Sequence, residues 1–175
     1  IEYIPEDGKV YRTTMTLGAV SDTQDAWGNL LPTGQCTYQM EDLLQVLQEF
    51  TGIIEQIPPM YSAVHHNGTR LYELARQGIE VERQARQIEI KTLKLLSTGI
   101  DEAGNSTVDL EIACSKGTYI RTLCHDMGQR LGTGAYMSKL VRTRAGIFTI
   151  QDALRLEEIA EQLQTLEEII KPMDY

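Results

Sequence analysis

Two stretches of alternating residue type constrain the fold of this chain most strongly. Residues 88–96 (IEIKTLKLL) and 106–115 (STVDLEIACS) largely alternate apolar and polar side chains, and the turn-forming stretch DEAGN lies between them at 101–105. Alternation with a period of two is typical of a β-strand, and two such strands joined by a short polar turn form a hairpin. We therefore expect an antiparallel hairpin at 88–115.

Further strands are indicated on both sides of this hairpin. Residues 9–19 (KVYRTTMTLGA) are rich in Thr, Val and Tyr, and 140–150 (LVRTRAGIFTI) has a similar composition. Both compositions favour strands. The stretch 21–34 (SDTQDAWGNLLPTG) is dense in Asp, Asn, Gly and Pro, which predicts a loop or a hairpin excursion. The prolines in 57–60 favour extended backbone.

Helical spacing of apolar residues predicts three helices and an acidic helical tail. The first runs from an N-cap at Thr37 to about Phe50, and the second covers 69–77 with Gly78 after its end. The third places Ile120, Leu123, Met127 and Leu131 on one face and stops at Gly132. Short acidic helices are expected over 155–170.

Strands and helices alternate without a βαβ repeat, which favours an α+β fold with a mixed, largely antiparallel sheet flanked by helices. A length of 175 residues that are 42% hydrophobic suits one core. We assign 1–150 to one domain and 151–175 to an acidic helical C-terminal segment. The apolar stretches are too short for a membrane span, and three cysteines without metal or disulfide spacing suit a reducing cytoplasm.

The charge of the chain is unevenly distributed. The net charge of −9 alone disfavours nucleic acid as a partner, because phosphate binding relies on Lys and Arg. Residues 116–144, however, contain one acid, Asp126, against a set of basic residues: Lys116, Arg121, Arg130, Lys139, Arg142 and Arg144. Local fields steer a polyanion more than the total charge does. The same stretch could equally be an ordinary solvated surface.

Common catalytic motifs are absent from the sequence. There is no Gly-rich phosphate loop, HExxH or G-x-S-x-G elbow. Asp22, Asp25 and Gly28 loosely suggest a metal loop, but they lack the further ligands of a calcium site, so we predict a turn held by Asx hydrogen bonds. Cys124 and His125 are adjacent, and neighbours on a helix do not face each other, which argues against a Cys–His nucleophile.

Four blocks of the sequence resemble the TruB family of tRNA pseudouridine synthases, in order and in approximate spacing. They are KVYRTTMTLG (9–18) followed by SDTQDAWGN, IPPMYSAVHHNGTRLYELARQG (57–78), CSKGTYIRTLCHDMGQRLGTGA (114–135) and LVRTRAGIF (140–148). This resemblance implies the pseudouridine synthase fold, although incomplete. It also implies a tRNA partner, whose T-loop uridine at position 55 is isomerised to pseudouridine without a metal or organic cofactor.

The resemblance assigns roles to individual residues. Tyr11 corresponds to the tyrosine that stacks on the flipped uracil and removes the proton from C5. Arg121 corresponds to the arginine that pairs with the nucleophilic aspartate, and Leu140 to a leucine that lines the uracil pocket. Tyr119 corresponds to the tyrosine of the family's KGTYIR block and is expected to bind substrate. Without the resemblance, each of these would be interpreted as an ordinary sheet, surface or core residue.

The sequence also departs from the family pattern. The nucleophilic aspartate of the family lies in a motif resembling G-H-x-G-x-L-D-P-x-A-x-G, which does not occur here, and no other Asp can be nominated. We expect a fragment that lacks this segment and the C-terminal RNA-binding PUA domain, that is inactive alone, and that leaves Arg121 uncompensated. His65 stands where a Lys is common, so Arg70 and Arg76 are the better phosphate contacts, with Lys116 and Arg142 as further substrate-binding residues.

Two functions therefore follow from the sequence. The first is a tRNA pseudouridine synthase, acting in the cytoplasm as a monomer on the T-stem-loop. The alternative is a non-catalytic RNA-binding module on the synthase scaffold, which would hold a folded RNA through its basic patch and aromatic residues. An upstream LDP motif in the coding frame would favour the enzyme.

Overall fold

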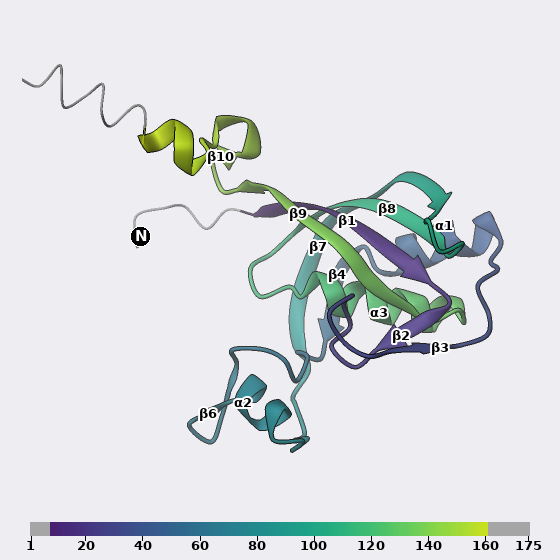
Figure 1. Ribbon diagram of the computed structural model, residues 1–175, viewed down its shortest axis with the longest axis horizontal. Helices are drawn as coiled ribbons and strands as arrows, with labels where there is room; N and C mark the ends of the chain where they lie inside the picture. The colour runs from purple at the N-terminus through teal and green to yellow at the C-terminus, as the bar shows by residue number, and fades with distance from the viewer. Residues whose placement is uncertain (1–7, 161–175) are drawn as a thin grey trace, which may run out of the picture.

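The computed structural model describes residues 8–160, which are organised around a six-stranded sheet with the order β10-β9-β1-β8-β7-β4 (Figure 1). The strands are β1 (Lys9–Leu17), β4 (Gly52–Gln56), β7 (Arg86–Ile100), β8 (Ser106–Cys114), β9 (Ala135–Ala145) and β10 (Phe148–Thr149). Every neighbouring pair in this sheet is antiparallel. The predicted α+β class with a largely antiparallel sheet is therefore confirmed.

The hairpin predicted at 88–115 forms two inner strands of this sheet, β7 and β8. Strands β7 and β8 pair from Ile90 opposite Cys114 to Ile100 opposite Ser106. The carboxylate of Asp101 closes the turn by accepting the backbone N–H of Ala103 and of Asn105 at 3.0 and 2.8 Å. Alternate residues of β8 are fully buried on one face: Val108, Leu110, Ile112 and Cys114. The period of two therefore marks the face that builds the core.

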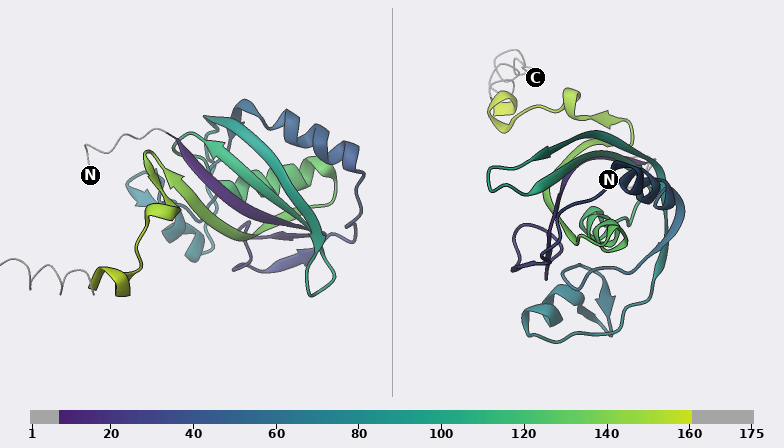
Figure 2. Two further views of the ribbon diagram at one scale, coloured as in Figure 1. Left: turned by 90° about the horizontal axis from the view of Figure 1, so that it is seen from above. Right: turned by 90° about the vertical axis from the view of Figure 1, so that its right-hand side faces the viewer.

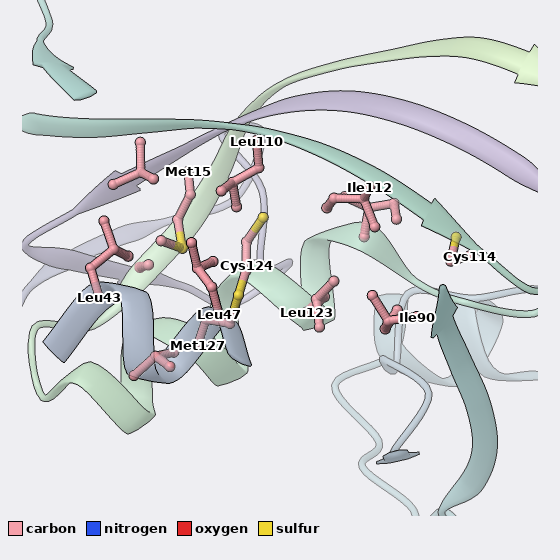
Figure 3. Close-up of a cluster of buried hydrophobic side chains, with 14 of the residues drawn as sticks. Met15, Leu43, Leu47, Ile90, Leu110, Ile112, Cys114, Leu123, Cys124 and Met127 are labelled. Atoms are coloured by element: carbon pink, nitrogen blue, oxygen red, sulfur yellow. The ribbon is translucent and has the colours of Figure 1, made fainter. Parts of the chain in front are cut away.

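Two helices cover this face. Figure 2 shows α1 (Met40–Glu49) and α3 (Ile120–Leu131) within the curve of the sheet. Their apolar residues interleave with those of the strands in one buried cluster, which includes Met15 of β1, Leu43 and Leu47 of α1, and Leu123 and Met127 of α3 (Figure 3). The third predicted helix is confirmed, including its end at Gly132, which has a left-handed φ of 78°.

The first helix starts later than predicted. The predicted N-cap at Thr37 is wrong, because the cap residue is Gln39, whose side chain makes no capping hydrogen bond. Glu41 and Asp42 lie in the first turn instead. Negative side chains there stabilise the positive end of the helix dipole, so the helix can begin without a side-chain cap.

Two small units lie beside the main sheet. Strands β2 (Ala19–Ser21) and β3 (Leu30–Pro32) form the predicted hairpin excursion. Strands β5 (His65–His66) and β6 (Thr69–Arg70) with α2 (Leu71–Arg76) form a lobe below the sheet in Figure 1, which we call the α2 lobe. Helix α2 starts two residues later than predicted, because Thr69 and Arg70 pair with His66 and His65.

The predicted strand 140–150 is wrong at both ends. It is interrupted by a turn at 146–147 between β9 and β10, and Ile150 begins a 3-10 helix instead of ending the strand. Strand β9 begins at Ala135, five residues before the predicted start at 140, because its first residues pair with β1 in spite of their mixed composition. Residues 156–160 are helical, and the rest of the predicted acidic helices to 170 lies outside the described residues. Within residues 8–160, no helix has both the length and the apolar character needed to cross a membrane.

Helix α3 approaches the start of β9 most closely at Gly128. A Cβ on Gly128 would lie 2.3 Å from Ala135 Cβ and 2.4 Å from the Ala135 backbone nitrogen. The Gly128 carbonyl also accepts the backbone N–H of Gly134 at 3.0 Å. The helix can therefore pack onto this strand only because residue 128 has no side chain.

We predict that Gly128→Ala destabilises the protein by about 2 kcal/mol, because the added methyl group must push α3 away from β9. The direction of the change is diagnostic, because a Gly→Ala substitution at an uncrowded position inside a helix would stabilise the protein by about 1 kcal/mol. Urea denaturation measures the difference. The exposed neighbour Gln129→Ala serves as control and should change the free energy of unfolding by less than about 0.5 kcal/mol.

Candidate functional site

Tyr11 lies in the middle of three paired strands. It is opposite Ile112 of β8 and opposite Arg142 of β9, and it is half-buried. Burial, and to a smaller extent the neighbouring Cys114, raise the pKa of Tyr11, while the Arg142 guanidinium acts to lower it. The site therefore offers a neutral phenol at pH 7 whose hydroxyl faces a cation.

Arg121 is held in the first turn of α3 by two partners. Its Nη1 donates to Oδ2 of Asp25 at 3.1 Å, and its Nη2 donates to the backbone carbonyl of Tyr61. The side chains of Arg121 and Asp25 are 20% and 12% exposed. The expectation that Arg121 is an uncompensated cation is wrong, because a carboxylate from a distant loop pairs with it.

The loop that carries Asp25 is itself tightly held. The other carboxylate oxygen, Oδ1, accepts the Thr23 hydroxyl at 2.7 Å and the Trp27 backbone N–H at 3.1 Å. Ala26 N–H donates to the Met137 carbonyl of β9 at 3.0 Å, and Met137 N–H donates back to Gln24 at 3.0 Å. The predicted turn with Asx hydrogen bonds is confirmed, and Asp25 uses its second oxygen to bind Arg121.

Strand β1 and helix α3 meet beside Tyr11. Thr13 is two residues after Tyr11 and therefore on the same face of the strand. Its hydroxyl lies 4.0 Å from Sγ of Cys124, which is one helical turn after Arg121. Leu140 is directly opposite Thr13 on β9 and is 43% exposed. The structure therefore places Tyr11, Leu140 and Arg121 in the region where α3 packs against the paired strands β1 and β9.

The start of α3 is fixed by a buried glutamine. Gln56, at the end of β4, is 3% exposed. Its Nε2 donates to the Tyr119 carbonyl at 3.1 Å, and its Oε1 accepts the Tyr119 backbone N–H at 2.8 Å. These two hydrogen bonds hold Tyr119, the residue that caps α3, and thereby set the position of Arg121. Lys116 lies three residues earlier, in the exposed turn between β8 and α3.

The remaining predicted site residues lie on the α2 lobe. His65 pairs with Arg70 in the β5–β6 hairpin, and Arg76 ends α2. The guanidinium groups of Arg70 and Arg76 lie 6.0 and 5.3 Å from the centre of the Tyr72 ring. The predicted residues thus form two groups, one around Tyr11 and one on the lobe. The Tyr61 carbonyl that binds Arg121 belongs to the segment that leads into the lobe.

Asp25 and Gln56 are site residues that sequence reasoning missed. Asp25 is separated from Arg121 by 96 residues, and Gln56 from Tyr119 by 63. No local pattern signals such pairs, although the Asx-type turn did mark Asp25 as structured. The rejection of a Cys–His nucleophile is supported, because burial raises the pKa of the Cys124 thiol to about 12.

Comparison with family models covers the whole chain. Residues 1–120 match the model described as TruB family pseudouridylate synthase (N terminal domain), and residues 121–175 match the tRNA pseudouridylate synthase B C-terminal domain. The second match begins within α3, at Arg121, so the boundary between the two models does not coincide with the predicted boundary at 150.

Curated relatives and solved structures give the same likeness. The tRNA pseudouridine synthase B of Syntrophomonas wolfei is 50% identical over 175 residues, covering 100% of this chain and 58% of that protein. The Listeria monocytogenes protein of the same name is 50% identical over 93% of this chain and 54% of its own length. A crystal structure of a Cbf5–Nop10–Gar1 complex superposes with a TM-score of 0.65 at 27% identity, covering 97% of this chain and 40% of that one. The chain thus spans just over half the length of these curated relatives.

We predict that Asp25→Asn destabilises the protein by about 2 kcal/mol, because Arg121 then keeps its charge in a largely buried site without a counter-charge. Chemical denaturation at neutral pH measures the loss. Asp22→Asn is the matched control, since Asp22 is an acid of the same loop whose carboxylate is hydrogen-bonded to Asn29 and pairs with no cation among residues 8–160. Equal effects of the two substitutions would contradict the role we assign to the ion pair.

Asp126 of α3 generates a prediction about pH. Burial raises the pKa of Asp126 from 3.8 to about 6. Between pH 3.8 and about pH 6, the native state keeps a proton on Asp126 that the unfolded state has already released. The stability of the native state therefore falls as the pH rises through this window. Asp126→Asn should increase the free energy of unfolding by about 1 kcal/mol near pH 7.5, allowing for partial exposure of the carboxyl, and should change little below pH 4. Denaturation at both pH values checks the sign.

Proposed function

The chain belongs to the TruB family of pseudouridylate synthases, and from this we propose that the protein converts the T-loop uridine of tRNA to pseudouridine. The observation that supports the proposal is that β1, which carries Tyr11, meets α3, which carries Arg121, at the Thr13–Cys124 contact, and that Arg121 is paired with Asp25. By resemblance to the family, Tyr11 would be the stacking tyrosine and Arg121 the carboxylate-binding arginine. We further propose that it acts in the cytoplasm, as a monomer, on the T-stem-loop.

The reaction needs the uridine to leave the base stack. The bond between N1 of uracil and C1′ of ribose breaks, the base rotates, and C5 bonds to C1′. The proton on C5 is then removed and N1 gains a proton, so that the product is an isomer of uridine. A flipped base needs apolar and aromatic walls. In our proposal the half-buried ring of Tyr11 provides one wall and the partly exposed Leu140 another.

Tyr11 is also our candidate for the base that accepts the C5 proton. A tyrosine phenol is neutral at pH 7, and burial raises the pKa of Tyr11 further, so it must pass on its own proton as it takes another. The Arg142 guanidinium, which acts to lower the pKa of Tyr11, would stabilise the phenolate that forms in between. Arg142 therefore supports proton transfer in this scheme as well as contacting substrate.

Arg121 has the donors to position a second carboxylate. A guanidinium carries five N–H donors, and the described contacts of Arg121 engage only Nη1 and Nη2. The aspartate motif of the family does not occur in these 175 residues. We therefore assign to this chain the stacking, proton-transfer and positioning parts of the site, and we assign the attack to the aspartate of that motif. An Arg already fixed by Asp25 and Tyr61 would hold that carboxylate ionised and oriented.

The α2 lobe is our candidate for holding the RNA backbone. The guanidinium groups of Arg70 and Arg76 both lie close to the partly buried ring of Tyr72, and His65 lies beside Arg70. Arginines bind phosphate bidentately, and each phosphate contact steepens the salt dependence of binding. The same feature favours the alternative function, a non-catalytic RNA-binding module, which would keep the lobe and lack the chemistry.

We predict that Tyr11→Phe lowers the rate of pseudouridine formation at least about a hundredfold, because the phenol oxygen that carries the proton is lost while the ring remains. Tritium release from C5-tritiated T-stem-loop RNA measures the rate with the whole gene product. RNA affinity should change less than about threefold, since stacking is preserved.

Tyr38→Phe provides the matched control. Tyr38 packs against the core ahead of α1, and its substitution should leave the rate unchanged. A Tyr11→Phe protein that releases tritium at the wild-type rate would contradict the role of Tyr11 as base. Binding of the RNA by the whole gene product without any tritium release would instead support the RNA-binding module.

A further inference from the structure

Trp27 is an exposed aromatic residue next to the candidate site. Its side chain is 95% exposed, the highest value among the large hydrophobic residues that the structure describes as exposed. It is also the only tryptophan in the sequence. Large aromatic side chains supply most of the energy of cores and interfaces, so the described fold gains nothing from this ring.

The backbone of Trp27 is fixed to the same carboxylate as Arg121. Trp27 N–H donates to Oδ1 of Asp25 at 3.1 Å, while Oδ2 accepts Nη1 of Arg121 at 3.1 Å. A single carboxylate, that of Asp25, therefore links the backbone of Trp27 to the Arg121 guanidinium. The exposed indole is attached to the same loop as the counter-charge of Arg121.

The loop that carries Trp27 is closely packed and hydrogen-bonded on both sides of this residue. At the next residue, Gly28, a Cβ would lie 2.1 Å from Asp22 Oδ1, 2.4 Å from Thr23 Oγ1 and 2.5 Å from Ser21 Oγ. On the other side of Trp27, Ala26 is bonded to Met137 of β9. The ring therefore stands on a backbone that is already ordered, and a ligand that covers it does not have to pay for ordering the loop.

We propose that Trp27 is a stacking platform for a nucleobase of the substrate RNA, beside the nucleotide that enters the site at Tyr11. This inference rests on the proposed function, because it takes RNA as the substrate. A flat π surface near an arginine fits a base joined to phosphate, and stacking on an aromatic ring is a common way to hold unpaired bases. Trp27 touches no reacting atom in this proposal and acts as a positioning residue.

Charge favours RNA over a protein segment as the occupant. The loop is bonded through Met137 to β9, which carries Lys139, Arg142 and Arg144 and no acid. Its other anchor is Arg121 at the start of α3. The loop itself carries Asp22 and Asp25, and Asp25 is paired with Arg121, so the positive charge that attracts a polyanion comes from β9. The bases of a bound RNA must be turned toward the protein if one of them is to reach Tyr11.

Fluorescence of the single tryptophan tests the proposal directly. The 175-residue chain is titrated with an unmodified T-stem-loop RNA that carries a terminal dye, so that dye anisotropy measures binding and tryptophan emission reports on Trp27. We expect emission to be quenched in parallel with binding. Trp27→Ala should weaken binding about tenfold, which corresponds to about 1.4 kcal/mol, and Trp27→Phe should stay within about threefold of wild type.

Abasic RNAs separate stacking from a structural effect. T-stem-loops that lack one base at a time in the loop should include one whose affinity for the wild type falls about tenfold but whose affinity for Trp27→Ala falls no further. Loss of fold would not produce this dependence on one base. Ile100→Ala, which removes a 74% exposed side chain at the far end of β7, should bind every RNA like the wild type.

The outcomes distinguish this inference from the proposed function. If the labelled RNA does not bind, the platform is overturned, while tritium release by the whole gene product decides the proposed function separately. If it binds while emission is unchanged and Trp27→Ala binds equally well, the platform is overturned and the proposed function stands. If emission changes with protein concentration in the absence of RNA, Trp27 contacts a second copy of the chain, and the platform is overturned as well.

Discussion

The ion pair between Arg121 and Asp25 is the interaction on which the arrangement of the site depends. Arg121 lies in the first turn of α3, Asp25 belongs to the loop after β2, and the Tyr61 carbonyl that Arg121 also binds belongs to the segment that leads into the α2 lobe. One guanidinium thus joins three segments that are distant in the sequence. A largely buried charge is stable only with such partners, so the pair fixes the geometry of the site as much as it stabilises the fold.

The site and the core share one face of the sheet. Toward the end of β1, Met15 and Leu17 are buried under the helices, whereas Tyr11, nearer its start, is only half-buried. Gly128 lets α3 pack closely on β9, and the Gln56–Tyr119 bonds fix where α3 begins. The packing that stabilises the domain therefore also positions Arg121 relative to Tyr11. Substitutions in this core should disturb the site without touching it.

Local sequence patterns predicted most helices and strands, and they failed where contacts between residues distant in the sequence determine the structure. The β7–β8 hairpin follows from its period of two, and α3 follows from its apolar spacing and Gly132. The early start of β9 depends on pairing with β1, and the Asp25–Arg121 pair joins residues 96 apart, so neither leaves a local signal. The roles of Tyr11 and Arg121 came from resemblance to a family, because a tyrosine on a strand and an arginine on a helix have many ordinary explanations.

The central claim is that a flipped uridine binds in the region where α3 packs against the paired strands β1 and β9. A crystal structure of the protein bound to a T-stem-loop RNA with 5-fluorouridine at the target position tests it most directly, since fluorine at C5 cannot leave as a proton. The account predicts that this base lies on the Tyr11 ring, between Leu140 and the Arg121–Asp25 pair. A target base that stays stacked within the loop, with the Tyr11 ring uncovered, would contradict it.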